Sequence, residues 1–257
     1  MSAEADADAG DWPEGVARHV LAEVDSTSSE AARLAPQLSQ PTWIMAHRQT
    51  AARGRRGRVW LSPEGNFAAT LVMRPSGAAA TVALRSFVAA LALRDALVLA
   101  CGPSARLSLK WPNDVLLNGG KVAGILLESV GQGGAISHLA IGIGVNLAVA
   151  PPAEAVEAGA TAPVSVLGET GLSVAPDMFL SWLAVAYAGW EAQFATYGFA
   201  PIRQAWLASA ARLGQPVTAR MVSETVTGTF ETVAEDGSLV LATAAGRRAI
   251  PAADVFF

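Results

Sequence analysis

The stretch Leu109-Lys-Trp-Pro-Asn-Asp-Val-Leu-Leu-Asn-Gly-Gly-Lys-Val-Ala-Gly124 consists of short apolar runs interrupted by turn residues. Asn118-Gly119-Gly120 is typical of a hairpin turn, because Asn and Gly readily adopt the positive φ angles that such turns need. The pattern therefore predicts neighbouring antiparallel strands. We expect them over Arg106–Trp111, Val115–Leu117 and Lys121–Val130.

Further strands and helices are predicted on both sides of this hairpin. The expected strands are His19–Val24, Thr42–His47, Asn66–Met73 and Ala135–Leu147, the last following a turn at Gly131–Gly134. The expected helices are Ser29–Leu34, with its N-terminal N–H groups capped by Asp25-Ser-Thr-Ser28, then Ala78–Ala100, Pro176–Thr196 and Pro201–Ala210. Residues 148–174 are expected to be a loop with one short helix. This order predicts an α+β fold with a mixed sheet.

The composition changes near the C-terminal end. From Gly214 to Phe257, short β-type runs alternate with turns, and Glu235-Asp236-Gly237 separates two of the runs. The runs are Thr225–Val233, Ser238–Ala242 and Arg247–Phe257. A segment of this size predicts a small SH3-like β-barrel. We therefore divide the chain into a disordered N-terminus over residues 1–15, a main domain over 16–212 and the barrel over 213–257.

The overall composition excludes several classes of protein. The chain has 257 residues, a net charge of −4 and one cysteine. An acidic chain is not attracted to nucleic acid or to anionic membranes through its global charge. The most apolar stretch, Ala78–Ala100, carries Arg85, Arg94 and Asp95, which argues against a membrane span. No signal peptide is visible, so a cytoplasmic protein without membrane or nucleic-acid partners is expected.

Lysine is scarce in this sequence. Lys110 and Lys121 are the only lysines among 18 basic residues. Since an ammonium is a compact point charge and a guanidinium is a planar fork, a retained lysine is a candidate for a place where arginine would not serve. Chance is the alternative explanation.

Three segments carry residues suited to chemistry. The first, Arg48–Trp60, holds five arginines and the glycines Gly54 and Gly57. Glycines let the backbone approach a ligand closely, and guanidinium groups match phosphate and carboxylate oxygens. The segment is neither a P-loop nor a dinucleotide fingerprint, because it lacks GK[ST] and GxGxxG. A solvated basic loop and a nucleic-acid patch remain alternatives.

The second segment is the hairpin itself. It should bring the ammonium groups of Lys110 and Lys121 close to the carboxylate of Asp114. An ordinary hairpin with an exposed Asp–Lys pair would show the same pattern.

The third segment is Ile141-Gly-Ile-Gly-Val-Asn-Leu147. Gly142 and Gly144 permit the close approach of a backbone or a flat ring, and Asn146 can donate to and accept from an adenine edge. A structural strand with a core asparagine is equally consistent. The histidines, His19, His47 and His138, lack metal-ligand spacing, so no metal site is predicted. Cys101 is expected to be core filler.

In this order, the segments resemble the biotin protein ligases. The family's arginine–glycine loop is similar to Ala52–Gly57, with Trp60-Leu-Ser-Pro63 beyond it, and its KWPND motif is Lys110–Asp114. Its GK-hydrophobic-AGIL motif is Gly120–Leu126, and its GIGVN motif is Gly142–Asn146. Two positions depart from the pattern: Ser28 replaces an asparagine and Ala52 replaces a glycine. The first should alter affinity rather than abolish activity, and the second should stiffen the loop.

The resemblance implies roles for individual residues. The residues expected to contact biotin or fold over it are Ser26, Thr27, Ser28, Gln49, Arg53, Gly54 and Arg55. Trp60 and Asn146 should frame adenine, and Arg55, Arg58 and Lys110 are candidates for the phosphates. Asn113 and Gly124 complete the expected binding residues. Lys121 should lie between the biotin carboxylate and the α-phosphate, where charge grows during attack. Asp114 should orient or deprotonate the incoming amine, or help to position metal.

The resemblance also implies a reaction. Biotin and ATP would form biotinyl-5′-AMP, and a lysine of a biotin carboxyl carrier protein would then take the biotin. Magnesium would arrive with the nucleotide, since no dedicated cage is visible. We expect the short form, without an N-terminal DNA-binding domain, as a monomer or homodimer. A lipoate or octanoate ligase of the same fold and a catalytically silent biotin-binding protein are the alternatives.

Overall fold

The main domain is built on one seven-stranded mixed sheet. The computed structural model describes residues 12–132, 135–157 and 159–257. The strands are β1 Ala17–Val24, β2 Thr42–Gln49, β3 Phe67–Met73, β4 Leu107–Lys110, β5 Asp114–Leu117, β6 Gly120–Gln132 and β7 Ala135–Val145. Their order in the sheet is β1-β2-β3-β7-β6-β5-β4. β1 and β2 are parallel, whereas the other neighbours are antiparallel, so the predicted mixed sheet is confirmed.

The predicted hairpin forms at the centre of the chain. β5 pairs with β6 across a turn in which Asn118 and Gly119 both have positive φ, as their residue types led us to expect. β4 pairs with β5 in the register that sets Lys110 opposite Asp114. Local chemistry alone therefore determines this part of the sheet.

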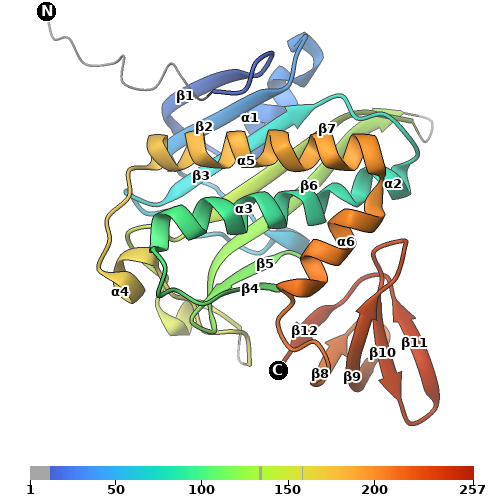
Figure 1. The fold of residues 1–257 in the computed structure, drawn as a ribbon. Helices are drawn as coiled ribbons and strands as arrows, with labels where there is room; N and C mark the ends of the chain where they lie inside the picture. The colour runs from blue at the N-terminus through green and yellow to red at the C-terminus, as the bar shows by residue number, and fades with distance from the viewer. Residues whose placement is uncertain (1–11, 133–134, 158) are drawn as a thin grey trace, which may run out of the picture.

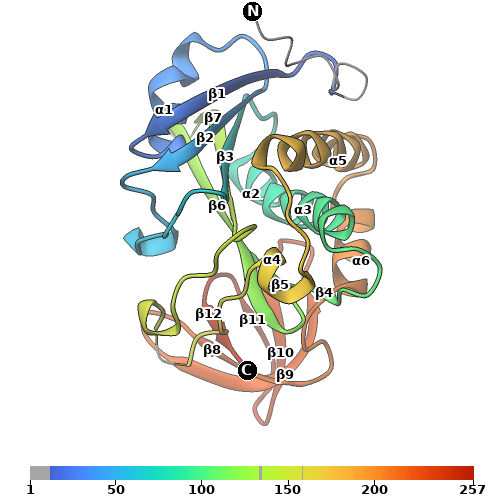
Figure 2. The ribbon, with the colours of Figure 1, turned by 90° about the vertical axis from the view of Figure 1, so that its left-hand side faces the viewer.

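Helices cover both faces of the sheet. α3 (Arg85–Cys101), α5 (Pro176–Tyr197) and α6 (Phe199–Ala208) lie on one face, and α1 (Thr27–Leu34) lies on the other (Figure 1 and Figure 2). The shorter helices are α2 (Ala79–Ala83), α4 (Val166–Thr170) and the 3-10 turns η1 (Ala35–Gln37), η2 (Arg55–Gly57) and η3 (Ala153–Ala155). Phe179 and Leu183 of α5 are fully buried, and their separation by four residues sets them on one face of the helix.

The prediction of one long helix over Ala78–Ala100 is wrong in one respect. It is broken at Leu84 into α2 and α3, where i to i+3 backbone hydrogen bonds replace the α-helical pattern. The turn at Gly237 packs on Leu84 and Phe87, and Arg85 forms a buried ion pair with Glu191 of α5 at 2.7 Å. Both contacts are tertiary, so the apolar run could not reveal the break.

The start of the first helix also differs from the prediction. α1 begins at Thr27, and the side chain of Ser26 makes no capping hydrogen bond. The backbone N–H of Thr27 instead donates to Oε1 of Gln49 at 2.8 Å. A side chain from the next strand thus caps the helix, and the hydroxyls of Thr27 and Ser28 contact Thr70 of β3 instead.

The C-terminal domain is an antiparallel sheet with the order β11-β10-β9-β8-β12, which fits an SH3-like fold. Its strands are β8 Pro216–Arg220, β9 Thr225–Val233, β10 Leu239–Thr243, β11 Gly246–Ile250 and β12 Asp254–Phe256. The single strand expected over Arg247–Phe257 is therefore wrong. A bend at Pro251-Ala252 separates β11 from β12, which crosses to pair with β8. Proline lacks the N–H that a continuing strand would need.

Contacts between the domains are specific. Trp111 Nε1 donates to the carbonyl of Gly237 at 3.0 Å, and Phe87, Trp206 and Phe230 form successive ring contacts between α3, α6 and β9. These contacts hold the C-terminal sheet beside α6 and β4 of the main domain (Figure 1).

Two predicted segments fall partly outside the described residues. They are the disordered N-terminus, of which residues 1–11 are not described, and the turn at Gly131–Gly134, of which 133–134 are not described. Trp12 lies in an ordered turn and donates to the carbonyl of Val16 at 2.7 Å. None of the helices in the described ranges has the length and apolar character needed to cross a membrane.

Candidate active site

A pocket of about 610 Å³ lies where the main sheet meets the C-terminal domain. Its walls come from the start of α1, the arginine segment, the hairpin, β7, residues 151–157 and 160–163, and β12. The predicted site residues that line it are Ser26, Ser28, Gln49, Arg53, Gly54, Arg55, Arg58, Trp60, Lys110, Asn113, Asp114, Lys121, Gly124 and Asn146. Thr27 is not part of the lining.

One end of the pocket is a buried set of neutral polar groups. Thr27 Oγ1 donates to Gln49 Oε1 at 3.2 Å and accepts from Thr70 Oγ1 at 2.9 Å. Ser28 Oγ lies 3.4 Å from Thr70 Oγ1, and a Cβ on Gly142 would come within 2.9 Å of it. This end can offer hydroxyl and amide groups to the head of a ligand, and the guanidinium of Arg53 lies at its edge against Ser29.

Trp60 forms the middle of the pocket. A Cβ built on Gly144 would lie 2.5 Å from its indole ring, and one on Gly124 would lie 3.3 Å from it. A flat ring thus lies against Gly144, one of the two glycines predicted to permit this, but the ring belongs to the protein, and the other glycine, Gly142, faces Ser28 instead. Trp60 is partly exposed in the pocket, and Lys121 Nζ lies 5.6 Å from its ring centroid.

Two lysines and one carboxylate lie together beyond this ring. Lys121 Nζ forms an ion pair with Asp114 Oδ1 at 2.8 Å. Lys110 is buried, donates to Thr161 Oγ1 at 2.7 Å, and lies 4.5 Å from the ring centroid of Phe257. Burial lowers the pKa of Lys110, the charge of Asp114 opposes that change, and the charge of Lys121 adds to it. The hairpin thus gathers the three charges that the sequence placed in one neighbourhood.

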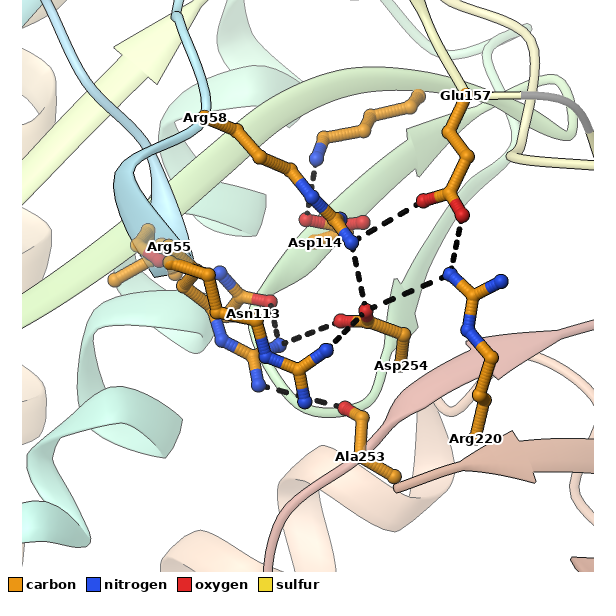
Figure 3. A network of polar contacts seen from close by, with 11 residues as sticks. Arg55, Arg58, Asn113, Asp114, Glu157, Arg220, Ala253 and Asp254 are labelled. Atoms are coloured by element: carbon orange, nitrogen blue, oxygen red, sulfur yellow. Dashed lines mark hydrogen bonds and ion pairs between the residues drawn. The ribbon is translucent and has the colours of Figure 1, made fainter. Parts of the chain in front are cut away.

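The arginine loop reaches across to the C-terminal domain (Figure 3). Arg56 and Arg58 each donate to Asp254 Oδ2 at 2.8 Å, and Arg55 Nη1 lies 3.8 Å from Asp254 Oδ1. Arg55 also donates to Asn113 Oδ1 at 3.3 Å and to the carbonyl of Ala253 at 3.4 Å. One carboxylate of β12 therefore holds three guanidinium groups of the loop, and Arg220 of β8 lies 4.0 Å from the same carboxylate.

The pKa values of these groups reflect that crowding. Burial lowers the pKa of Arg55, and the charges of Asp254 and Asp114 oppose the change. Burial alone would raise the pKa of Asp254, but the hydrogen bond from Arg58 and the nearby guanidinium charges outweigh it, so the pKa is lowered. Asp254 is thus held as an anion among cations.

Two predicted ligand contacts are engaged elsewhere. Arg53 donates to Ser29 Oγ at 2.8 Å and pairs with Glu128 at 3.2 Å. Asn146 is buried and donates to the carbonyl of Val164 at 3.0 Å. Asn146 thus makes a structural hydrogen bond, as the alternative reading of its strand anticipated, even though it also lines the pocket.

Several lining residues were not predicted from the sequence: Glu157, Thr161, Asp254 and Phe256. Glu157 pairs with Arg58 at 3.1 Å and with Arg220 of β8 (Figure 3). The available signal for Asp254 was an isolated acid between Ala253 and Val255 in an apolar C-terminal run. Within the described ranges, no three His, Cys, Asp or Glu side chains group as a metal site would require.

The sequence matches two family models in the order that the fold shows. Residues 21–146 match the biotin/lipoate A/B protein ligase family, and residues 213–257 match the biotin protein ligase C terminal domain. The chain is 63% identical to a biotin–[acetyl-CoA-carboxylase] ligase of Paracoccus denitrificans, over 93% of this chain and 99% of the relative. The chain belongs to the biotin protein ligase family. This result confirms the resemblance drawn from the motifs.

Other members of the family are more distant. The bifunctional ligase/repressor BirA of Bacillus subtilis is 30% identical over 92% of this chain and 71% of its own length. A biotin protein ligase from Aquifex aeolicus, solved in complex with biotin and ATP, superposes with a TM-score of 0.78 at 27% identity. The match covers 93% of this chain and 98% of that one. The α+β fold with a C-terminal SH3-like domain is thus the architecture of this ligase.

Proposed function

We propose that this protein joins biotin to ATP as biotinyl-5′-AMP and transfers the biotin to a lysine of a biotin carboxyl carrier protein. The observation that carries the proposal is the division of one pocket into two chemically different ends. Neutral polar groups around Ser28 and Gln49 line one end, and Lys110, Lys121 and the arginine loop line the other. Biotin has a neutral polar head that suits the first end. Its carboxylate would meet a phosphate of ATP at the second end.

In the first step, a carboxylate oxygen of biotin attacks the α-phosphorus of ATP. The bond from that phosphorus to the bridging oxygen breaks, and pyrophosphate leaves. Lys121 is suited to stabilise the negative charge that gathers on the phosphate oxygens, because its ammonium is fixed by Asp114 beside Trp60. Arg55, Arg58 and Lys110 would hold the remaining phosphates, and Trp60 would stack against adenine.

In the second step, the amine of a carrier lysine attacks the carbonyl carbon of the adenylate. The bond from carbon to the phosphate oxygen breaks, AMP leaves, and the amine loses a proton. Asp114 is the carboxylate of the hairpin that lines the pocket, so it is the candidate to orient the amine and accept that proton. Once phosphates draw Lys121 away, Asp114 would be free for this task.

Magnesium fits this site only as a partner of the nucleotide. Asp114 is one carboxylate and is already paired with Lys121, so it does not form a cage for the ion. When bound, the ion would neutralise part of the phosphate charge.

The proposal also covers organisation and location. Residues 16–212 would be the catalytic domain and residues 213–257 a C-terminal domain that completes the nucleotide end of the pocket. The carrier would belong to a biotin-dependent carboxylase, as the name of the Paracoccus relative suggests. We place the protein in the cytoplasm, where its buried Cys101 would stay reduced.

The experiment that tests the proposal is ATP–pyrophosphate exchange by the purified chain, with biotin, lipoate or octanoate as the acid. We expect exchange that depends on biotin and is much slower with either fatty acid. Faster exchange with lipoate or octanoate would favour a lipoate or octanoate ligase. An absence of exchange, with biotin still bound, would favour a silent biotin-binding protein.

A further inference from the structure

The two lysines of the pocket are held in opposite ways. Lys121 is committed to an ion pair with Asp114 at 2.8 Å. Lys110 takes part in none of the ion pairs found in the described ranges, although its residue is only 6% exposed. A buried ammonium without a carboxylate partner is costly and needs some other source of stabilisation.

Neutral groups supply that stabilisation. Thr161 Oγ1 accepts a hydrogen bond from Lys110 Nζ at 2.7 Å, and the ring of Phe257 lies 4.5 Å from the same nitrogen. The negative face of an aromatic ring attracts a cation within about 6 Å, and this ring does so although Phe257 is 46% exposed. The guanidinium carbon of Arg212 lies 5.3 Å from the same ring, so two cations share it.

This arrangement has a consequence for binding an anion. A carboxylate beside Lys110 would cancel its charge, and a phosphate would have to displace that carboxylate. A ring and a hydroxyl hold the ammonium in place without neutralising its positive charge. Lys110 is therefore able to bind an anion without first losing an ion pair, whereas Lys121, Arg56 and Arg58 each have a carboxylate to release.

We propose that Phe257 is a positioning residue for Lys110: its ring holds the ammonium at the pocket in a form ready to bind a phosphate of the nucleotide. The inference rests on the proposed function for the identity of that anion. It adds a residue just beyond β12, in the C-terminal domain, to the nucleotide end of the site.

The test compares Phe257→Leu, which removes the ring, with Phe257→Tyr, which keeps it. Val222→Ala is the control, because Val222 is in the same domain and 96% exposed. Binding of a non-hydrolysable ATP analogue is measured by calorimetry, and KM for ATP and biotin by pyrophosphate exchange. We expect Phe257→Leu to weaken analogue binding by roughly three- to tenfold and to raise KM for ATP equally. KM for biotin and kcat should stay the same, and Phe257→Tyr and Val222→Ala should match the wild type.

A second comparison separates positioning from general packing. In a Lys110→Gln background, Phe257→Leu should cause no further loss, because the ring acts through the ammonium. Persistence of the loss in that background would overturn the inference, as would equal affinity of Phe257→Leu and the wild type. If Phe257→Leu does not fold, Phe257→Met replaces the ring with a flexible side chain under the same criteria. Analogue binding is read independently of turnover, so absent exchange would count against the proposed function and not against Phe257.

Discussion

Lys121 pairs with Asp114 and lies 5.6 Å from the ring centroid of Trp60, and we propose that the carboxylate of biotin and the α-phosphate of ATP meet beside it. Removing one preorganised group that stabilises developing charge commonly slows a reaction by roughly 100- to 1,000-fold. We expect Lys121→Ala to slow biotin-dependent pyrophosphate exchange by at least about tenfold while the protein stays folded. Circular dichroism checks the fold.

The matched control is Arg248→Ala, which also removes one cation. Arg248 pairs with Glu224 on the surface of the C-terminal domain, away from the pocket lining. Its exchange rate should match the wild type. A folded Lys121→Ala variant with the wild-type rate would refute the role given to this lysine.

Gly144 tests the position of Trp60. A methyl group on Gly144 would come within 2.5 Å of the indole, so Gly144→Ala must push the ring out of its place. We expect kcat/KM for ATP to fall by roughly tenfold, since small misplacements in a site are costly. Gly189→Ala is the control, because Gly189 lies in α5 with nothing within 4 Å of the added group. An unchanged kcat/KM for ATP in Gly144→Ala would show that Trp60 does not need this position.

At the scale of elements, the arginine loop depends on β12. Asp254 holds Arg55, Arg56 and Arg58 across the domain boundary (Figure 3). In Asp254→Asn this charge is lost, and we expect trypsin to cleave the ligand-free loop at those arginines faster than in the wild type. Biotin with ATP should slow cleavage over residues 49–58 in both proteins, because the phosphates would become partners of the loop arginines.

Glu231→Gln is the control for this experiment, since Glu231 pairs with Arg247 on the same domain but does not touch the loop. Its cleavage should match the wild type. Equal cleavage of Asp254→Asn and wild type would mean that other contacts hold the loop. Cleavage unaffected by biotin and ATP would contradict the proposed closure over ligand.

These elements show what the sequence could and could not predict. The hairpin was predictable, because Asn118 and Gly119 make its turn locally and their chemistry is visible in the sequence. The break at Leu84 was not, since it depends on a turn near Gly237 that is distant in the sequence. Asp254 was missed as a site residue for the same reason: it meets Arg56 and Arg58 across 198 and 196 positions of the chain.

At the scale of the whole molecule, the scarcity of amines limits how readily the protein can be acylated. Lys110 is buried against Phe257 and Thr161, and Lys121 is paired with Asp114. Apart from these two side chains, the chain offers only its α-amino group to an acylating agent. An α-amino group has an ordinary pKa of about 7.7–8.0, below the roughly 10.4 of lysine, so more of it is free base at neutral pH.

Release of biotinyl-5′-AMP from the pocket tests how few amines of the protein an acylating agent can reach. Arg55 ties the loop to Asn113 and to the carbonyl of Ala253, so Arg55→Gly should let the reactive anhydride escape. We expect this variant to biotinylate bystander proteins while labelling itself weakly, mainly at the α-amino group. Peptide mass spectrometry after incubation with biotin and ATP measures both.

Arg48→Gly serves as the control, because Arg48 pairs with Glu23 outside the pocket lining and should retain the adenylate. Dominant biotin on Lys110 or Lys121 of the Arg55→Gly protein would contradict the burial and pairing assigned to them.

The central claim is that one pocket both activates biotin and passes it to a carrier lysine. The most direct measurement incubates the purified protein with biotin, ATP and an apo biotin carboxyl carrier domain, and follows the carrier by intact-mass spectrometry. A variant of the carrier with arginine at its acceptor lysine is the control. We expect one biotin per carrier, dependent on ATP, and none on the control. An unmodified carrier, or one modified by lipoate in preference to biotin, would contradict it.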